Sequence, residues 1–186
     1  MNRLVRLTPR PRRKAPPPNT AAIHFALGEC SLGMFLVADA GRGICAILLG
    51  DNGTGLKAEL AGHFPAASLV EASGGLDAAL AWARRLIEAP DRHTHTQLDA
   101  RGTAFQQRVW RALREIPAGS TMSYSQIAQR IGSPSSVRAV AGACAANALA
   151  VAIPCHRVVR ADGALSGYRW GIARKSALLK REKALV

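Results

Sequence analysis

A polar stretch from Pro90 to Gly102 divides the chain into two halves with different hydrophobic patterns. Before it, apolar residues occur in short continuous runs, which are typical of β-strands. After it, they recur at intervals of three and four residues, which are typical of helices. The sequence therefore predicts a small α/β domain at residues 21–100, followed by a mainly helical domain at residues 101–186.

The first domain has three apolar runs that predict strands, at residues 23–27, 33–37 and 44–49. Two further stretches, at 56–64 and 76–89, predict helices; the second places its apolar residues on one face. We expect a small antiparallel sheet with these helices packed against it.

The second domain contains signals for four helices. Thr103 and Gln106 form a capping box in front of the first helix. Residues 123–131, 136–146 and 172–184 follow as the other three. Between the last two helices lies an apolar run that we expect to be a buried, extended segment.

The second and third of these helices have the pattern of a helix-turn-helix. Ala128 lies four positions before the turn glycine Gly132, a spacing that lets two helices pack closely. The following helix offers Arg138 and then small residues such as Ala139 and Gly142, so it lacks side chains that read the major groove. We expect binding in the minor groove, independent of sequence, with Arg138 entering the base stack. The alternative is a core helix with close Ala-Gly contacts.

The same two halves also differ in net charge. Residues 101–186 have a net charge of +11 and residues 21–100 a net charge of −4, within a total of +13. The C-terminal half is therefore expected to bind a polyanion, with nucleic acid as the leading candidate. A basic surface that only aids solubility is the alternative. Residues 1–20 are basic and proline-rich, which predicts a disordered tail or linker.

Neither a membrane partner nor a secretory signal is expected. No apolar run approaches the ~20 residues that span a bilayer, and the arginines near the N-terminus precede no apolar segment. The cysteines at positions 30, 45, 144 and 155 lack paired or metal-type spacing. We expect reduced thiols in the cytoplasm.

Cys155 is the most informative cysteine, because it follows the apolar run at 149–153 and precedes His156. It can be an inert buried thiol, the nucleophile of a Cys-His hydrolase, or a thiolate that accepts a group from DNA. Neighbouring residues of an extended segment point to opposite sides, which disfavours a direct Cys-His pair. The acceptor needs an activated cysteine, a DNA-binding element and a pocket for an extruded base. All three ingredients fall within residues 124–182.

Long motifs in the second domain resemble the O6-alkylguanine-DNA alkyltransferases. They are FQQRVW at 105–110, SYSQIA at 123–128, VRAVAGACAAN at 137–147, IPCHRVV at 153–159 and LSGYRWGIARKSALLKRE at 165–182. The resemblance is strong over residues 103–186 and weaker over residues 21–100, where it implies a ribonuclease-H-like companion domain.

The resemblance implies direct-reversal DNA repair by a methylated-DNA--protein-cysteine methyltransferase. An alkyl group of O6-alkylguanine, or of O4-alkylthymine, in double-stranded DNA would pass irreversibly to Cys155 after minor-groove binding and base flipping. It further implies a monomer, associated with the nucleoid in the cytoplasm, that uses no cofactor and no metal. A helix-turn-helix regulator without chemistry is the competing interpretation.

The resemblance also assigns roles to single residues. Cys155 would accept the alkyl group, and His156 would draw off the thiol proton through a water molecule. Glu182 would orient His156, and Asn147 would brace the turn before the cysteine. Tyr124 would donate its hydroxyl to guanine N3.

Two larger sets complete this assignment. The implied DNA-binding residues are Ser123, Tyr124, Arg138, Ala139 and Gly142. The implied substrate pocket consists of Pro154, Val158, Ser166, Gly167, Tyr168, Arg169 and Trp170.

Two departures from the family narrow the expectation. Some larger bacterial relatives carry an N-terminal zinc-bound cysteine cluster that accepts alkyl groups from phosphotriesters, and residues 1–20 are too short for one. We therefore expect repair of bases without zinc-based sensing. The bulky Trp170 is expected to narrow the pocket and to make benzyl adducts poorer substrates than methyl adducts.

Overall fold

The computed structural model describes residues 22–89, 96–165 and 167–183. The predicted tail at 1–20, the predicted pocket residue Ser166 and the last residues of the final predicted helix lie outside these ranges. No described helix has the length and apolar character needed to cross a membrane.

The N-terminal half is built on one sheet with the strand order β3-β2-β1-β4. Its strands are β1 (Ile23–Cys30), β2 (Gly33–Asp39), β3 (Ile44–Gly50) and β4 (Leu69–Glu71). The three predicted strands are confirmed, and they pair antiparallel in sequence order. The expectation of an entirely antiparallel sheet is wrong, because β4 pairs parallel to β1. The helix between β3 and β4 carries the chain across the sheet, so that β4 runs in the direction of β1.

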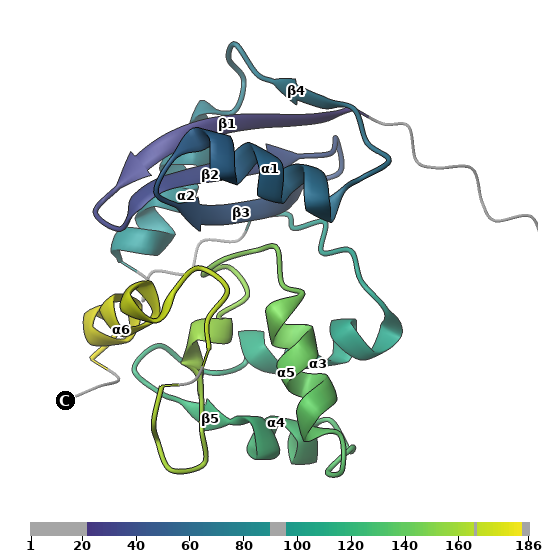
Figure 1. The fold of residues 1–186 in the computed structure, drawn as a ribbon, viewed down its shortest axis with the longest axis vertical. Coiled ribbons are helices and arrows are strands. Elements are labelled where there is room, and N and C mark those ends of the chain that lie inside the picture. Colours follow the sequence, from purple (N-terminus) through teal and green to yellow (C-terminus); the bar gives the residue numbers. More distant parts are fainter. Residues whose placement is uncertain (1–21, 90–95, 166, 184–186) are drawn as a thin grey trace, which may run out of the picture.

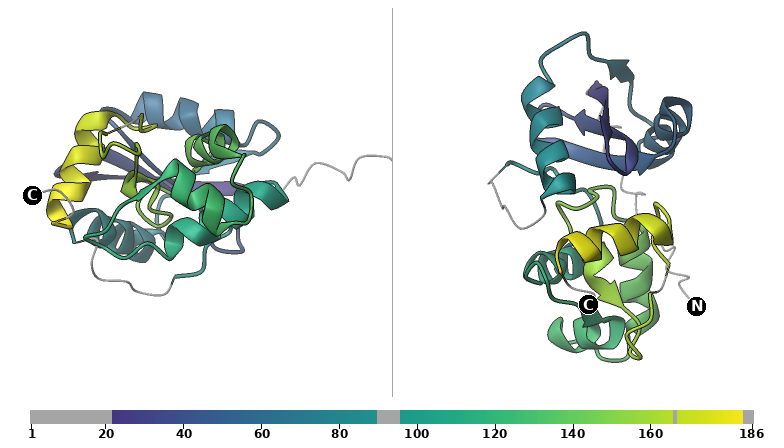
Figure 2. Two further views of the ribbon diagram at one scale, coloured as in Figure 1. Left: turned by 90° about the horizontal axis from the view of Figure 1, so that it is seen from below. Right: turned by 90° about the vertical axis from the view of Figure 1, so that its left-hand side faces the viewer.

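Helices cover both faces of this sheet. Helix α1 (Gly53–His63) contacts β2 and β3, and helix α2 (Asp77–Glu88) contacts β1 and β2. The views of Figures 1 and 2 place α1 and α2 on opposite sides of the strands. Both predicted helices are thus confirmed, and they enclose a core that is almost entirely apolar.

The C-terminal half is mainly helical, as predicted. Its helices are α3 (Ala104–Arg114), α4 (Tyr124–Arg130), α5 (Val137–Ala145) and α6 (Ile172–Arg181). Both α3 and α4 begin with a complete capping box, in which Thr103 pairs with Gln106 and Ser123 with Gln126. Helices α3, α4 and α5 pack against one another. Two short strands, β5 (Met122–Ser123) and β6 (Val158–Val159), pair parallel beside them.

The apolar run before Cys155 forms a turn, so the expected extended segment is wrong. The side-chain amide of Asn147 donates to the carbonyl oxygens of Leu149 and Ile153, at 3.4 and 2.9 Å, and so closes the turn between them. Val151 has a φ of 64°, an unusual conformation for a β-branched residue that an extended strand would not allow. Cys155 then opens a 3₁₀ turn, η1 (Cys155–Arg157).

The two halves share one continuous hydrophobic core. Strand β3 faces the helical half in Figure 1, and Ile47 exchanges backbone hydrogen bonds there with Ala148 and Ala150. At the start of the strand, Ile44 pairs with Leu98. The turn that leads to Cys155 is therefore attached to the sheet of the N-terminal half.

Candidate functional site

A hollow of about 480 Å³ opens beside Cys155. It is lined by Tyr124, Ala141, Cys144, Ala145, Cys155, Gly167, Tyr168 and Arg169. Helix α5 thus forms one wall, and the segment before α6 forms another.

The predicted pocket residues divide into two groups. Gly167, Tyr168 and Arg169 line the hollow, whereas Pro154, Val158 and Trp170 do not. The Trp170 side chain is buried, and its ring meets the Tyr168 ring edge-on, with centroids 5.2 Å apart. Trp170 therefore supports the wall from behind and reaches the hollow only through Tyr168.

Cys155 is buried, with 5% of its surface exposed. Asn147 donates from Nδ2 to its Sγ at 3.3 Å. Burial raises the pKa of the Cys155 thiol, while the Asn147 hydrogen bond and the positive charge of Lys175 act in the opposite direction. In the resting protein this group is thus a protonated thiol, which needs a base before it becomes nucleophilic.

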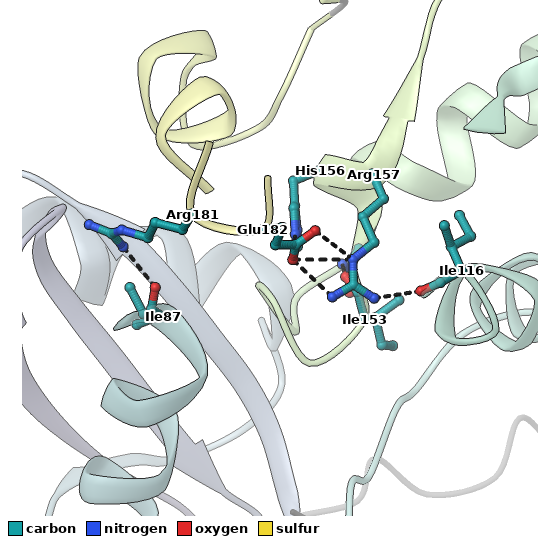
Figure 3. A network of polar contacts seen from close by, with 8 residues as sticks. Ile87, Ile116, Ile153, His156, Arg157, Arg181 and Glu182 are labelled. Atoms are coloured by element: carbon teal, nitrogen blue, oxygen red, sulfur yellow. Dashed lines mark hydrogen bonds and ion pairs between the residues drawn. The ribbon is translucent and has the colours of Figure 1, made fainter. Parts of the chain in front are cut away.

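His156 lies next to Glu182 in the core (Figure 3), with Nε2 2.8 Å from Oε1. An ionised carboxylate only accepts hydrogen bonds, so Nε2 carries the proton and Nδ1 presents its lone pair. Among the described residues, Nδ1 of His156 is buried without a hydrogen-bond partner. Burial lowers the pKa of His156 despite the opposing effect of Glu182, which leaves the ring neutral at pH 7 and able to accept a proton.

Arg157 completes this network, although the sequence analysis assigned it no role. Its Nε and Nη2 donate to the Glu182 carboxylate at 3.0 and 2.8 Å, and its Nη1 donates to the carbonyl of Ile116. Burial opposes ionisation of Glu182, but the hydrogen bonds from His156 and Arg157 lower its pKa below the usual value. Glu182 is therefore a charged acceptor held between two donors.

Lys175 is a second buried cation that the sequence analysis missed. It lies on α6 with no exposed surface, and its Nζ donates to the carbonyl oxygen of Val158. Burial lowers its pKa. The sequence did contain a signal for this burial. Lys175 precedes Leu178 and Leu179 by three and four residues, which places it on the same apolar face of the helix.

The predicted DNA-binding residues lie in two environments. Arg138, Ala139 and Gly142 are exposed on one side of α5. A Cβ added to Gly142 would meet nothing within 4 Å, so this side of the helix is bare. Ser123 is buried, and its hydroxyl caps α4 by accepting from Gln126 N at 3.2 Å. Tyr124 follows it and lines the hollow.

Metal ligands are not evident in the described part of the chain, where no three His, Cys, Asp or Glu side chains gather. Four of the residues with predicted catalytic roles lie together and are joined directly or through neighbouring backbone: Cys155, Asn147, His156 and Glu182. Tyr124 lines the same hollow as Cys155.

Comparison with known proteins gives consistent results for both halves. The family model described as 6-O-methylguanine DNA methyltransferase, DNA binding domain, matches residues 104–184. The chain is 55% identical over 161 residues to the bifunctional transcriptional activator/DNA repair enzyme Ada of Escherichia coli, a match that covers 87% of this chain and 46% of Ada. It is 56% identical over 88 residues to the methylated-DNA--protein-cysteine methyltransferase of Mycobacterium tuberculosis, covering 47% of this chain and 53% of the relative. The chain spans about half the length of these curated relatives.

The solved structures extend the comparison to the whole fold. The crystal structure of Mycobacterium tuberculosis O6-methylguanine methyltransferase superposes with a TM-score of 0.71 at 34% identity, covering 87% of this chain and 93% of that chain. The methyltransferase from Pyrococcus kodakaraensis, at 22% identity and a TM-score of 0.68, shares the fold. The fold of both halves thus matches that of these methyltransferases, and the helical half matches the family model described as the DNA binding domain. The chain belongs to the O6-methylguanine-DNA methyltransferase family.

Proposed function

We propose that this chain repairs alkylated DNA by direct reversal. Cys155 accepts the alkyl group of O6-alkylguanine, and of O4-alkylthymine, in double-stranded DNA. The observation that carries the proposal is the buried Cys155 thiol in the lining of a hollow, followed directly by a neutral His156 that Glu182 orients. Family membership supports the same reaction.

The removal of the Cys155 thiol proton explains why the reaction needs the buried network of His156 and Glu182. The thiol must lose its proton as the S–C bond forms and the C–O6 bond breaks, because a thiolate in an apolar pocket is unfavourable. His156 Nδ1 takes that proton through a water molecule, and Glu182 stabilises the imidazolium that results. The electron pair of the C–O6 bond leaves with the guanine, which regains a proton. The resulting thioether does not hydrolyse, so each molecule acts once.

Two further residues assist this transfer. Tyr124 lines the same hollow as the cysteine, and its hydroxyl would donate to guanine N3 as charge develops on the departing base. Asn147 holds the turn before Cys155 and donates to the sulfur, so it fixes the direction of attack. Gly167 and Tyr168 would surround the alkyl group.

For DNA binding, we propose that α4 and α5 form a helix-turn-helix that enters the minor groove. The bare side of α5 at Ala139 and Gly142 supports a close approach to the sugar-phosphate walls. Arg138, at the start of that side, fills the space left by the flipped nucleotide. Ser123 and Tyr124 lie at the start of α4 and would contact the backbone beside that nucleotide.

The remaining expectations on architecture and location belong to the same proposal. The sheet, with three antiparallel strands and a fourth parallel to the first, supports a ribonuclease-H-like N-terminal domain at residues 21–100. Residues 101–186 form the acceptor domain. The protein acts as a monomer on the nucleoid in the cytoplasm, where its substrate is.

Intact-mass spectrometry after incubation with an O6-methylguanine duplex tests the proposal. We expect the protein to gain one methyl group, and Cys155→Ser to gain none while still binding DNA. Cys144→Ser is the matched control, because Cys144 lines the same hollow but should not accept the group. A helix-turn-helix regulator would show sequence-specific binding and no methyl gain in any variant, which would refute the proposal.

A further inference from the structure

The wall of the hollow is held by a residue of the N-terminal half. Oε1 of Glu59, on α1, accepts hydrogen bonds from Arg169 Nε at 2.7 Å and from Trp170 Nε1 at 3.1 Å. These donors are more than a hundred residues away in the sequence. The segment that closes the hollow is therefore tied to the domain that carries no reacting group.

This contact reaches the hollow by two routes. Arg169 lines the hollow, and its Nη1 donates to the carbonyl of Ala145 at 2.6 Å, so the arginine joins α1 to the end of α5. Trp170 packs edge-on against Tyr168, which also lines the hollow and meets the ring of His156 at 6.5 Å. A movement of Glu59 would thus displace both side chains of the wall.

Glu59 is charged in this position. Burial opposes its ionisation, but the nearby His63 ring and the Arg169 hydrogen bond lower its pKa below the ordinary value. His63 lies one turn along α1, with Nε2 3.8 Å from the same oxygen. A charged acceptor holds a guanidinium and an indole N–H more firmly than a neutral one would.

We propose that Glu59 is a positioning residue that fixes the shape of the alkyl pocket, and hence the size of group that reaches Cys155. This inference rests on the proposed function. It gives the N-terminal half a specific role: α1 supplies the acceptor that sets the distance between Tyr168 and the cysteine. Misplacement of a wall by about 1 Å can change a rate by up to two orders of magnitude.

The test compares single-turnover rates on duplexes that contain O6-methylguanine or O6-benzylguanine. We expect Glu59→Ala to slow methyl transfer about tenfold and to reduce the preference for methyl over benzyl, because the wall loses its support. Glu59→Gln keeps an acceptor oxygen and should lie between Glu59→Ala and the unmodified chain. A merely structural role would reduce the fraction of active protein and leave the ratio of the two rates unchanged.

Glu71→Gln is the matched control, since Glu71 pairs with Lys57 at 2.6 Å on the surface of the same half. Its ratio of rates should equal that of the unmodified chain. Hydrogen exchange of residues 167–171 gives a readout that is independent of catalysis. It should accelerate in Glu59→Ala, less so in Glu59→Gln, and not in Glu71→Gln. If Glu59→Ala does not fold, Glu59→Gln carries both measurements.

The outcomes separate the two proposals. If the unmodified chain transfers no alkyl group, the proposed function is refuted. If hydrogen exchange at residues 167–171 is nevertheless faster in Glu59→Ala, the structural role of Glu59 in holding this segment still stands. Normal transfer with an unchanged ratio of rates and unchanged exchange in the variants would overturn the role of Glu59.

Discussion

The two halves bury different kinds of side chains. All of the buried polar or charged residues in the described chain belong to the C-terminal half: Ser123, Asn147, His156, Arg157, Lys175 and Glu182. The described residues 22–89 bury only apolar ones. Because the desolvation of a buried ion pair can cost more than its attraction returns, the C-terminal half accepts a loss of stability that the N-terminal half avoids.

The proposed function gives a reason for this difference. The N-terminal core is filled by residues such as Phe35, Leu36 and Leu48, which contribute hydrophobic burial and close packing. The proposed reaction needs a proton acceptor beside a buried thiol, and the neutral His156 ring that would supply it is held by the charged side chain of Glu182. Contacts such as the ion pair of Glu59 with Arg169 join the apolar N-terminal half to the C-terminal half, which contains the buried charges.

The largest effect should come from Glu182→Ala. It would leave both His156 and Arg157 without their acceptor in the core, and an unpaired buried cation costs about 3–5 kcal/mol. Urea denaturation measures the loss. Glu115→Ala is the control, because Glu115 pairs with Arg130 at 2.9 Å on the surface and should cost less than about 1 kcal/mol. Similar losses for the two variants would show that the buried network is not specially costly to break.

A core variant of the N-terminal half should lower stability without changing the chemistry. Leu36→Ala removes a fully buried side chain from β2, for an expected loss of about 3 kcal/mol. The methyl-transfer rate per folded molecule should stay unchanged, measured well below the midpoint of unfolding. Leu36→Met, which nearly conserves volume, is the control and should cost less than about 1.5 kcal/mol. A slower transfer in folded Leu36→Ala would mean that the two halves are not separable in this way.

The sequence predicted the regular elements well and the site contacts only in part. Helices α3 and α4 could be predicted because their capping boxes and apolar stripes are local signals. The turn before Cys155 could not, because it depends on hydrogen bonds from the Asn147 side chain and on contacts with β3, which are made only in the folded chain. An apolar run alone is equally consistent with a strand.

The same reasoning applies to charge. Arg157 and Lys175 were counted with the basic residues expected at a surface for DNA, yet both are buried. Composition gives the number of charges and not their depth, which is set by partners distant in sequence. Glu182 lies 25 residues from Arg157, and Val158 lies 17 residues from Lys175. Part of the positive charge of the C-terminal half therefore lies in its core and is not on the surface that would face DNA.

The smallest predicted effect is a dependence of stability on pH that originates in His156 of the C-terminal half. The folded-state pKa of His156 lies below its ordinary value because the ring is buried. Below about pH 6.5 the unfolded chain therefore binds a proton that the folded chain does not, and the free energy of unfolding falls as the pH falls. Arg157 and Lys175 oppose protonation of the ring, and Glu182 favours it. We expect a loss of about 1 kcal/mol between pH 7.5 and pH 5.5.

Urea denaturation at the two pH values measures this loss, with His24→Gln as the control, since His24 is exposed in the N-terminal half. His156→Gln should be less stable at pH 7.5 and should lose most of the dependence, whereas His24→Gln should keep it. The pKa of Glu182 is also lowered, so its contribution is retained at pH 5.5 and is lost only below about pH 4.5. An equal pH dependence in His156→Gln and the unmodified chain would mean that folding does not lower the pKa of His156. Burial would then not be what keeps the ring neutral, and the pH dependence would not distinguish the two halves.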